Sequence, residues 1–116
     1  MIESTPRIIT GIFSFRGSGF AYPSALSGLE PYIVPADKRT QMIYLRAGNS
    51  TDEMVTLVLL RNGTPMRLFP VGAKAAIHIA LSVIEDLFPE TRLELRIAAP
   101  EDVSGTLVLD MGLLEI

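Results

Sequence analysis

Apolar residues recur at every second position in several stretches of this sequence, and that period restricts the fold more than any other feature. Apolar and charged side chains alternate between Thr91 and Ala98, where the apolar positions are Leu93, Leu95 and Ile97. Successive side chains of a strand point to opposite faces, so this segment is predicted to be a strand with one buried and one wet face. Residues 55–60 are mostly apolar at both odd and even positions, so both faces of the strand are apolar. This is typical of a central strand covered on both sides.

The dipeptide Asn62-Gly63 separates residues 55–60 from the apolar run Met66–Phe69. A type I′ turn needs two residues with positive φ, and Asn-Gly supplies both, so the sequence predicts a β-hairpin here. Pro65 follows the turn and has no backbone N–H. Its strand is therefore expected to be an edge strand, or to be unpaired at that end.

Clusters of turn residues separate further predicted strands at residues 8–15, 40–47 and 105–111. Residues 73–88 fit both a strand and a helix with a polar stripe, and the β-branched residues there favour the strand. One domain is expected over residues 1–116. The predicted fold class is all-β, a small antiparallel β-sandwich or jelly roll, with α+β as the alternative if 73–88 is helical.

Residues 16–36 are rich in glycine, serine and proline, and five of the eight aromatic residues lie in or just before this segment. A long connection of this kind is usually a functional loop or an arm that lies on a partner. Aromatic side chains in residues 16–32 suit a carbohydrate- or peptide-binding site. The candidate binding residues are Arg16, Phe20, Tyr22 and Tyr32. In the alternative interpretation, Phe20, Tyr22 and Leu26 cap one end of the sandwich.

Reactive side chains are scarce, because the chain has one histidine and no cysteine. No nucleophile-elbow motif accompanies His78, and one imidazole does not make a catalytic zinc site. Arg16-Gly17-Ser18-Gly19 matches the start of the glycine-rich dinucleotide-binding motif, but Tyr22 occupies the position of the third glycine, so the motif is incomplete. We therefore predict no catalytic residue, no metal site and no cofactor. A small enzyme built around His78 is the least favoured alternative.

The composition indicates a partner. With glycine counted and tyrosine left out, 62 of 116 residues are apolar, about 53% against a usual value of roughly 45–50%. A domain of this size leaves roughly a third of its unfolded-chain surface exposed, so part of this apolar excess is expected outside. Eight of the ten basic residues are arginine, which suits subunit contacts. Arg46 and Asp110, each between apolar neighbours, are predicted members of a buried or interfacial ion pair.

These features lead to a non-catalytic structural or assembly protein that forms a homo-oligomer through apolar sandwich surfaces. Its expected partners are copies of itself or other subunits of an assembly. By architecture alone it is similar to the small sandwich and jelly-roll modules of phage particles. A net charge of −3 argues against nucleic acid as the partner. The sequence shows no signal peptide and no apolar run of ~20 residues, so no membrane contact and a cytoplasmic or particle-associated location are expected.

Overall fold

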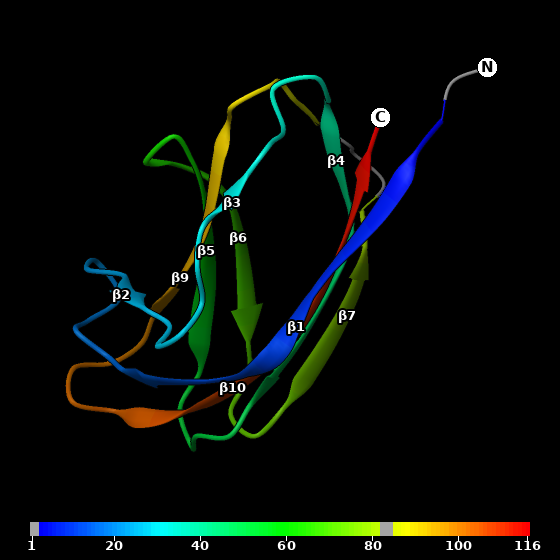
Figure 1. Cartoon of the computed structure of the whole chain (residues 1–116). Coiled ribbons are helices and arrows are strands. Elements are labelled where there is room, and N and C mark those ends of the chain that lie inside the picture. The colour runs from blue at the N-terminus through cyan, green and yellow to red at the C-terminus, as the bar shows by residue number, and fades with distance from the viewer. Residues whose placement is uncertain (1–2, 82–84) are drawn as a thin grey trace.

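The computed structural model describes residues 3–81 and 85–116, which form two antiparallel β-sheets packed face to face (Figure 1). Sheet A contains β1 (Thr5–Arg16), β4 (Thr40–Asn49), β7 (Ala76–Ala80), β8 (Asp86–Leu87) and β10 (Ser104–Glu115). Sheet B contains β2 (Ser24–Ala25), β3 (Tyr32–Ile33), β5 (Val55–Arg61), β6 (Thr64–Val71) and β9 (Arg92–Ala98). The predicted all-β sandwich or jelly roll is confirmed, and the α+β alternative is wrong, because the described residues contain no helix.

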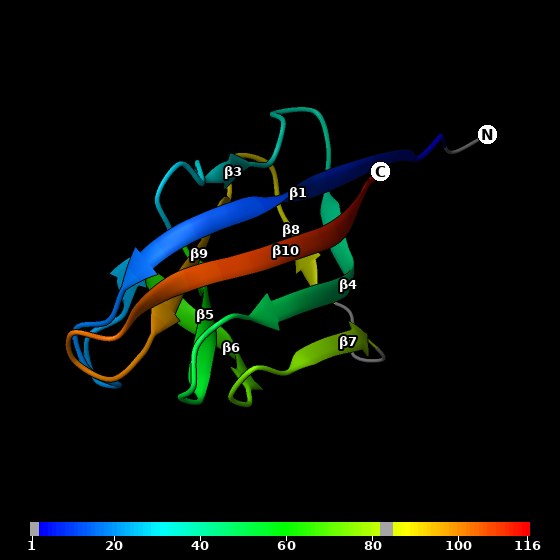
Figure 2. The ribbon, with the colours of Figure 1, turned by 90° about the horizontal axis from the view of Figure 1, so that it is seen from below.

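The chain crosses between the sheets at most of its connections. Sheet A has the order β1-β10-β4-β7, as Figure 2 shows, and sheet B has the order β2-β9-β5-β6. The two-residue strands β2 and β3 both pair with β9, so they share one edge position of sheet B. Two four-position sheets wound by alternate crossings are the arrangement of a jelly roll. The described residues include no helix long and apolar enough to span a membrane.

The core lies between the sheets and consists of the side chains that alternation assigns to the inner faces. On β9, Leu93, Leu95 and Ile97 are buried, whereas Arg92 and Arg96 are exposed, so the predicted one-sided strand is confirmed. The prediction of a central strand is also confirmed, because β5 lies between β9 and β6. On its outer face Val58 and Leu60 are buried together with Ala98.

The predicted hairpin joins β5 and β6. Asn62 and Gly63 have φ angles of 50° and 83°, the positive values that a type I′ turn requires. The strand that contains Pro65 is an edge of sheet B, as expected for a residue without an N–H.

Strand rather than helix is confirmed for the described part of residues 73–88, which forms β7 and β8. Residues 82–84, which the prediction also covered, lie outside the described residues, as do Met1 and Ile2. The predicted strands at 8–15 and 105–111 are longer in the structure, where β1 and β10 pair over twelve positions from Thr5 with Glu115 to Arg16 with Ser104.

The predicted long loop or arm at residues 16–36 contains two short paired stretches. Ser24 and Ala25 pair with β9, and so do Tyr32 and Ile33, so the segment forms an interrupted edge strand of sheet B. Leu26 and Val34 are buried in the core. The sequence does not predict this edge strand, because each paired stretch has only two residues and is too short to show a period of two.

Candidate functional site

The outer face of sheet A carries three parallel rows of side chains across β1, β10, β4 and β7. The middle row is polar, and its members are Thr10, Asp110, Arg46 and His78. The rows on either side are small or apolar, one made of Ile12, Val108, Gly48 and Ala76, the other of Ile8, Gly112, Tyr44 and Ala80. This face therefore presents a polar strip between two apolar strips.

Tyr44 organises the polar row. Its hydroxyl donates a hydrogen bond of 3.0 Å to Asp110, and its ring meets the ring of His78 edge-on at a centroid distance of 6.2 Å. The hydrogen bond to Asp110, followed by burial, raises the pKa of Tyr44 above its ordinary value. The guanidinium of Arg46 lies 5.6 Å from the centre of the same ring. Tyr44 thus contacts all three ionisable side chains of the row on β4, β7 and β10.

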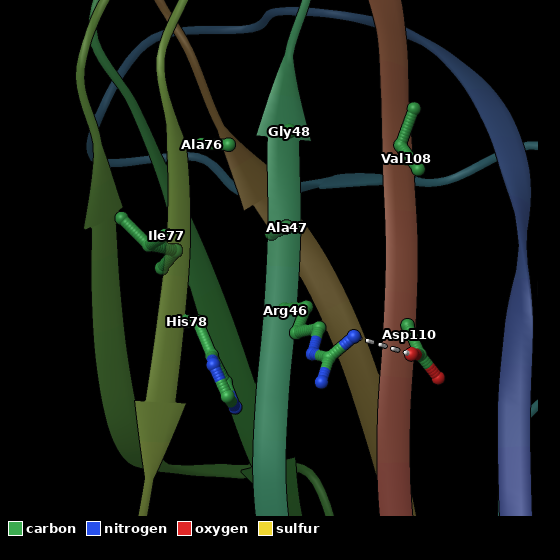
Figure 3. A pocket seen from close by; sticks show the side chains of 8 residues that line it. All are labelled: Arg46, Ala47, Gly48, Ala76, Ile77, His78, Val108 and Asp110. Atoms are coloured by element: carbon green, nitrogen blue, oxygen red, sulfur yellow. Dashed lines mark ion pairs between the residues drawn. The ribbon is translucent and has the colours of Figure 1, made fainter.

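A hollow of about 720 Å³ opens beside this row, and Figure 3 shows the side chains that line it. Its floor is low because Gly48 and Ala76 carry almost no side chain, and Val108 stands beside them. Arg46, Asp110 and His78 lie at one end of the hollow. The volume falls within the roughly 300–1,000 Å³ of typical ligand pockets.

The predicted ion pair between Arg46 and Asp110 exists, but its expected burial is wrong. The two residues face each other across β4 and β10, with 3.9 Å between Arg46 Nη1 and Asp110 Oδ2. The side chain of Arg46 is 58% exposed because it projects from the outer face rather than into the core. Whether the pair lies in an interface stays a prediction.

The four predicted binding residues do not form one site. Arg16 pairs with Asp102 at 2.6 Å, at the end of β1, where the neighbouring Gly17 donates a backbone hydrogen bond to Val103. Phe20 and Tyr22 follow this anchored turn and are exposed, so they do not cap the sandwich as Leu26 does. Their binding role stays a prediction.

Tyr32 belongs to a separate hydrogen-bond network. Its hydroxyl donates to the buried carboxylate of Glu115 and shares a 2.9 Å hydrogen bond with Thr40. Arg7 donates to the same carboxylate at 3.0 Å. The phenol joins sheet B to the last strand of sheet A, so Tyr32 has a structural role. Among the four candidate residues, the exposed aromatic side chains are Phe20 and Tyr22.

His78 is an exposed residue of β7, and among residues 3–81 and 85–116 no three histidine, aspartate or glutamate side chains gather as a metal site. Sequence reasoning missed the hollow, because its shape depends on which strands neighbour β4. One signal was present in the sequence. Gly48 directly follows the predicted strand at 40–47, and Ala76 has the same phase as His78, so a small residue on the outward face leaves a gap at both places.

The free edge of β1 is the second feature of this face. β1 pairs with β10 on one side only, and it forms the outer edge of sheet A (Figure 2). Ile8 and Ile12 project from it and are 65% and 71% exposed. An open hollow of about 440 Å³ lies beside this edge, between β1 and residues 28–32.

Comparisons with known proteins are limited to the fold. No protein family and no curated protein matches the sequence. The structure is similar to the CBM36-1 domain of a multidomain xylanase from the hindgut metagenome of Trinervitermes trinervoides, with a TM-score of 0.54 and 14% identity over 91% of this chain and 96% of that domain.

Two weaker likenesses cover most of this chain but only a part of the other protein. One is to the insecticidal delta-endotoxin Cry8Ea1 of Bacillus thuringiensis, with a TM-score of 0.47 and 10% identity over 96% of this chain and 19% of that one. The other is to the infectious bursal disease virus Gx strain structure, with a TM-score of 0.48 and 11% identity over 98% and 33%. The likeness to the CBM36-1 domain is one of fold alone, and it agrees with the β-sandwich of this chain.

Proposed function

We propose that this chain is a non-catalytic assembly module whose copies pair edge to edge through β1, so that sheet A continues from one subunit into the next. The observation that carries this proposal is the free edge of β1. Exposed strand edges attract other strands, and proteins usually protect them with charges, prolines or a covering segment. Between Arg7 and Arg16 this edge strand has no charged residue.

The backbone groups that point to the free edge can be assigned from one hydrogen bond. The carbonyl of Ser14 accepts from the N–H of Ser27, at 2.9 Å, on the side away from β10. The N–H and C=O of one strand residue point to the same side, and the side alternates along the strand. Ile8, Thr10 and Ile12 therefore present their backbone N–H and C=O groups at the free edge.

Two positions bound this stretch, and they are symmetric about Thr10. Pro6 has no N–H to offer, and the carbonyl of Ser14 is already used by Ser27. If two copies pair antiparallel with Thr10 at the centre, Pro6 of one copy lies opposite Ser14 of the other. Ile8 then lies opposite Ile12 of the second copy, and no two charged residues are opposed. The unpaired stretch is thus complementary to itself in one register, which favours a second copy as its partner.

Pairing in this register would bury the exposed side chains of Ile8 and Ile12 against each other. Aliphatic pairs on one face of an antiparallel ladder stabilise it, each by roughly 0.2–1 kcal/mol. The hollow between β1 and residues 28–32 leaves open space beside the edge. Strand addition of this kind obtains its affinity from main-chain hydrogen bonds and its specificity from alternate side chains.

The molar mass in dilute solution tests this proposal. We expect light scattering to give twice the 12.6 kDa of one chain. Thr10→Pro removes the central N–H without removing a backbone hydrogen bond to β10, and proline is tolerated where an edge N–H faces solvent. It also removes the hydroxyl that donates to the carbonyl of Leu109 on β10. This variant should be monomeric with an intact β-sheet circular dichroism spectrum. The matched variant Thr10→Val loses the same threonine hydroxyl, keeps the N–H, and should remain dimeric.

Single cysteine variants test the register, because the natural chain has no cysteine. Opposed residues of a hydrogen-bonded antiparallel pair lie about 5.5 Å apart at Cα, within disulfide range. Under oxidation, Thr10→Cys should form a covalent dimer, and Ile12→Cys alone should not. If the unmodified chain is monomeric, or if the double variant Ile8→Lys, Ile12→Lys remains as dimeric as the natural chain, pairing through β1 is wrong.

A further inference from the structure

The hollow on the outer face of sheet A has a polar end whose groups are arranged to hold a small ligand. Arg46 and Asp110 are 3.9 Å apart there, which is longer than a hydrogen bond. A hydroxyl group placed between them can accept from the guanidinium and donate to the carboxylate at the same time. Asp110 is held for this by the hydrogen bond from Tyr44, and His78 lies on the other side of Arg46 in the same row.

The charges of this end select against simple ions. An anion drawn to Arg46 would meet the carboxylate of Asp110, and a cation drawn to Asp110 would meet the guanidinium. A neutral group that both donates and accepts satisfies the two together, because aspartate only accepts and arginine only donates. A hydroxyl is such a group, and a pair of neighbouring hydroxyls could also engage His78.

The remainder of the hollow is apolar. Gly48 and Ala76 form a nearly flat floor, and the side chain of Val108 rises beside it. A ligand that fits has hydroxyls at one end and a C–H face of similar width to place on this floor. We infer that the hollow between Arg46, Asp110 and Val108 binds one sugar unit of a neutral saccharide.

This site is independent of the assembly proposed above. β1 pairing adds strands in the plane of sheet A, whereas the hollow opens on its face over β4, β7 and β10. A monomeric Thr10→Pro variant should therefore still bind saccharide, and a failure of either proposal leaves the other intact.

The test uses the full chain, labelled with ¹⁵N, and four soluble probes added one at a time. The probes are the β-1,4-linked hexasaccharides of glucose, xylose, mannose and N-acetylglucosamine. At least one of them should shift the amide signals of Gly48, Ala76 and His78 in a saturable manner. Arg46→Ala should weaken this binding at least about tenfold, because it removes a hydrogen bond donated by a charged group. Its melting temperature should not change, since the side chain is exposed.

Gly48→Leu provides a second variant that leaves every polar group in place. A Cβ at position 48 would lie 3.6 Å from Val108 Cβ, an ordinary contact, so the new side chain can occupy the hollow without strain. It should also weaken binding at least about tenfold. The matched control is Arg96→Ala, which removes an exposed, ion-paired arginine from a strand of sheet B and should leave binding unchanged.

Three outcomes would overturn the inference. One is that none of the four probes shifts these amides. Another is that the shifts centre on Phe20 and Tyr22. The third is that Arg96→Ala weakens binding as much as Arg46→Ala does.

Discussion

Replacing Leu57 with alanine should lower the free energy of unfolding by about 2–5 kcal/mol, the usual cost of deleting a fully buried leucine side chain. Leu57 is 0% exposed and lies on β5, between β9 and β6, where it faces the core shared by both sheets. β5 is itself paired on both sides, so its backbone cannot move far enough to fill the space. Since small domains are stable by only about 5–15 kcal/mol, this single change removes a large part of the total.

The same substitution on the neighbouring strand provides the control. Leu68 on β6 lies opposite Val58, and its side chain points outward with 64% exposure. Leu68→Ala should change the free energy of unfolding by no more than about 0.5 kcal/mol. Urea titrations followed by circular dichroism measure both variants. Equal losses for the two leucines would mean that the core does not lie where the structure places it.

Sequence reasoning succeeded where a local pattern determines the structure. The alternation around Leu95 correctly predicts which face of β9 is buried. Asn62-Gly63 correctly predicts the hairpin, because both residues have the positive φ that its turn requires. It failed where the outcome depends on distant neighbours. Ser24, Ala25, Tyr32 and Ile33 become edge residues only because β9 has an open side, which no property of residues 16–36 reveals.

The candidate sites show the same division. The pairing of Arg46 with Asp110 was anticipated from their apolar neighbours, but their position on an exposed face depends on the register between β4 and β10. The absence of charge between Arg7 and Arg16 is visible in the sequence, whereas the free edge appears only when β1 takes the outermost place in sheet A. Composition indicated an exposed apolar surface, and topology decided where it lies.

Tyr32→Phe should lower the free energy of unfolding at neutral pH by about 1–3 kcal/mol, because the buried carboxylate of Glu115 then loses a hydrogen-bond donor. Tyr22→Phe is the matched control, since this exposed tyrosine has no hydrogen-bond partner of its hydroxyl among the described residues. It should leave stability unchanged. Denaturant unfolding of both variants and the natural chain measures the difference, and similar losses for the two tyrosines would show that the network does not stabilise the fold.

The dependence of stability on pH gives this network a second signature. The hydrogen bond from Tyr32, followed by that from Arg7, holds the pKa of Glu115 below its ordinary value of 4.5 against the opposing effect of burial. The carboxylate therefore stabilises the fold above about pH 4.5, and this contribution is lost as the pH falls through the lowered pKa.

Tyr32 makes the stability of the fold depend on pH in the alkaline range. Burial, and then the hydrogen bond to Glu115, raises the pKa of Tyr32 from 10.0 to about 12. A group whose pKa is raised on folding stabilises the fold below its unfolded pKa, so this contribution is complete below pH 10 and is lost as the pH rises toward 12. Tyr32→Phe should remove this alkaline loss and weaken the acid one, because the pKa of Glu115 returns toward its ordinary value. A variant profile parallel to that of the natural chain at both ends would contradict the coupling of Tyr32 to Glu115.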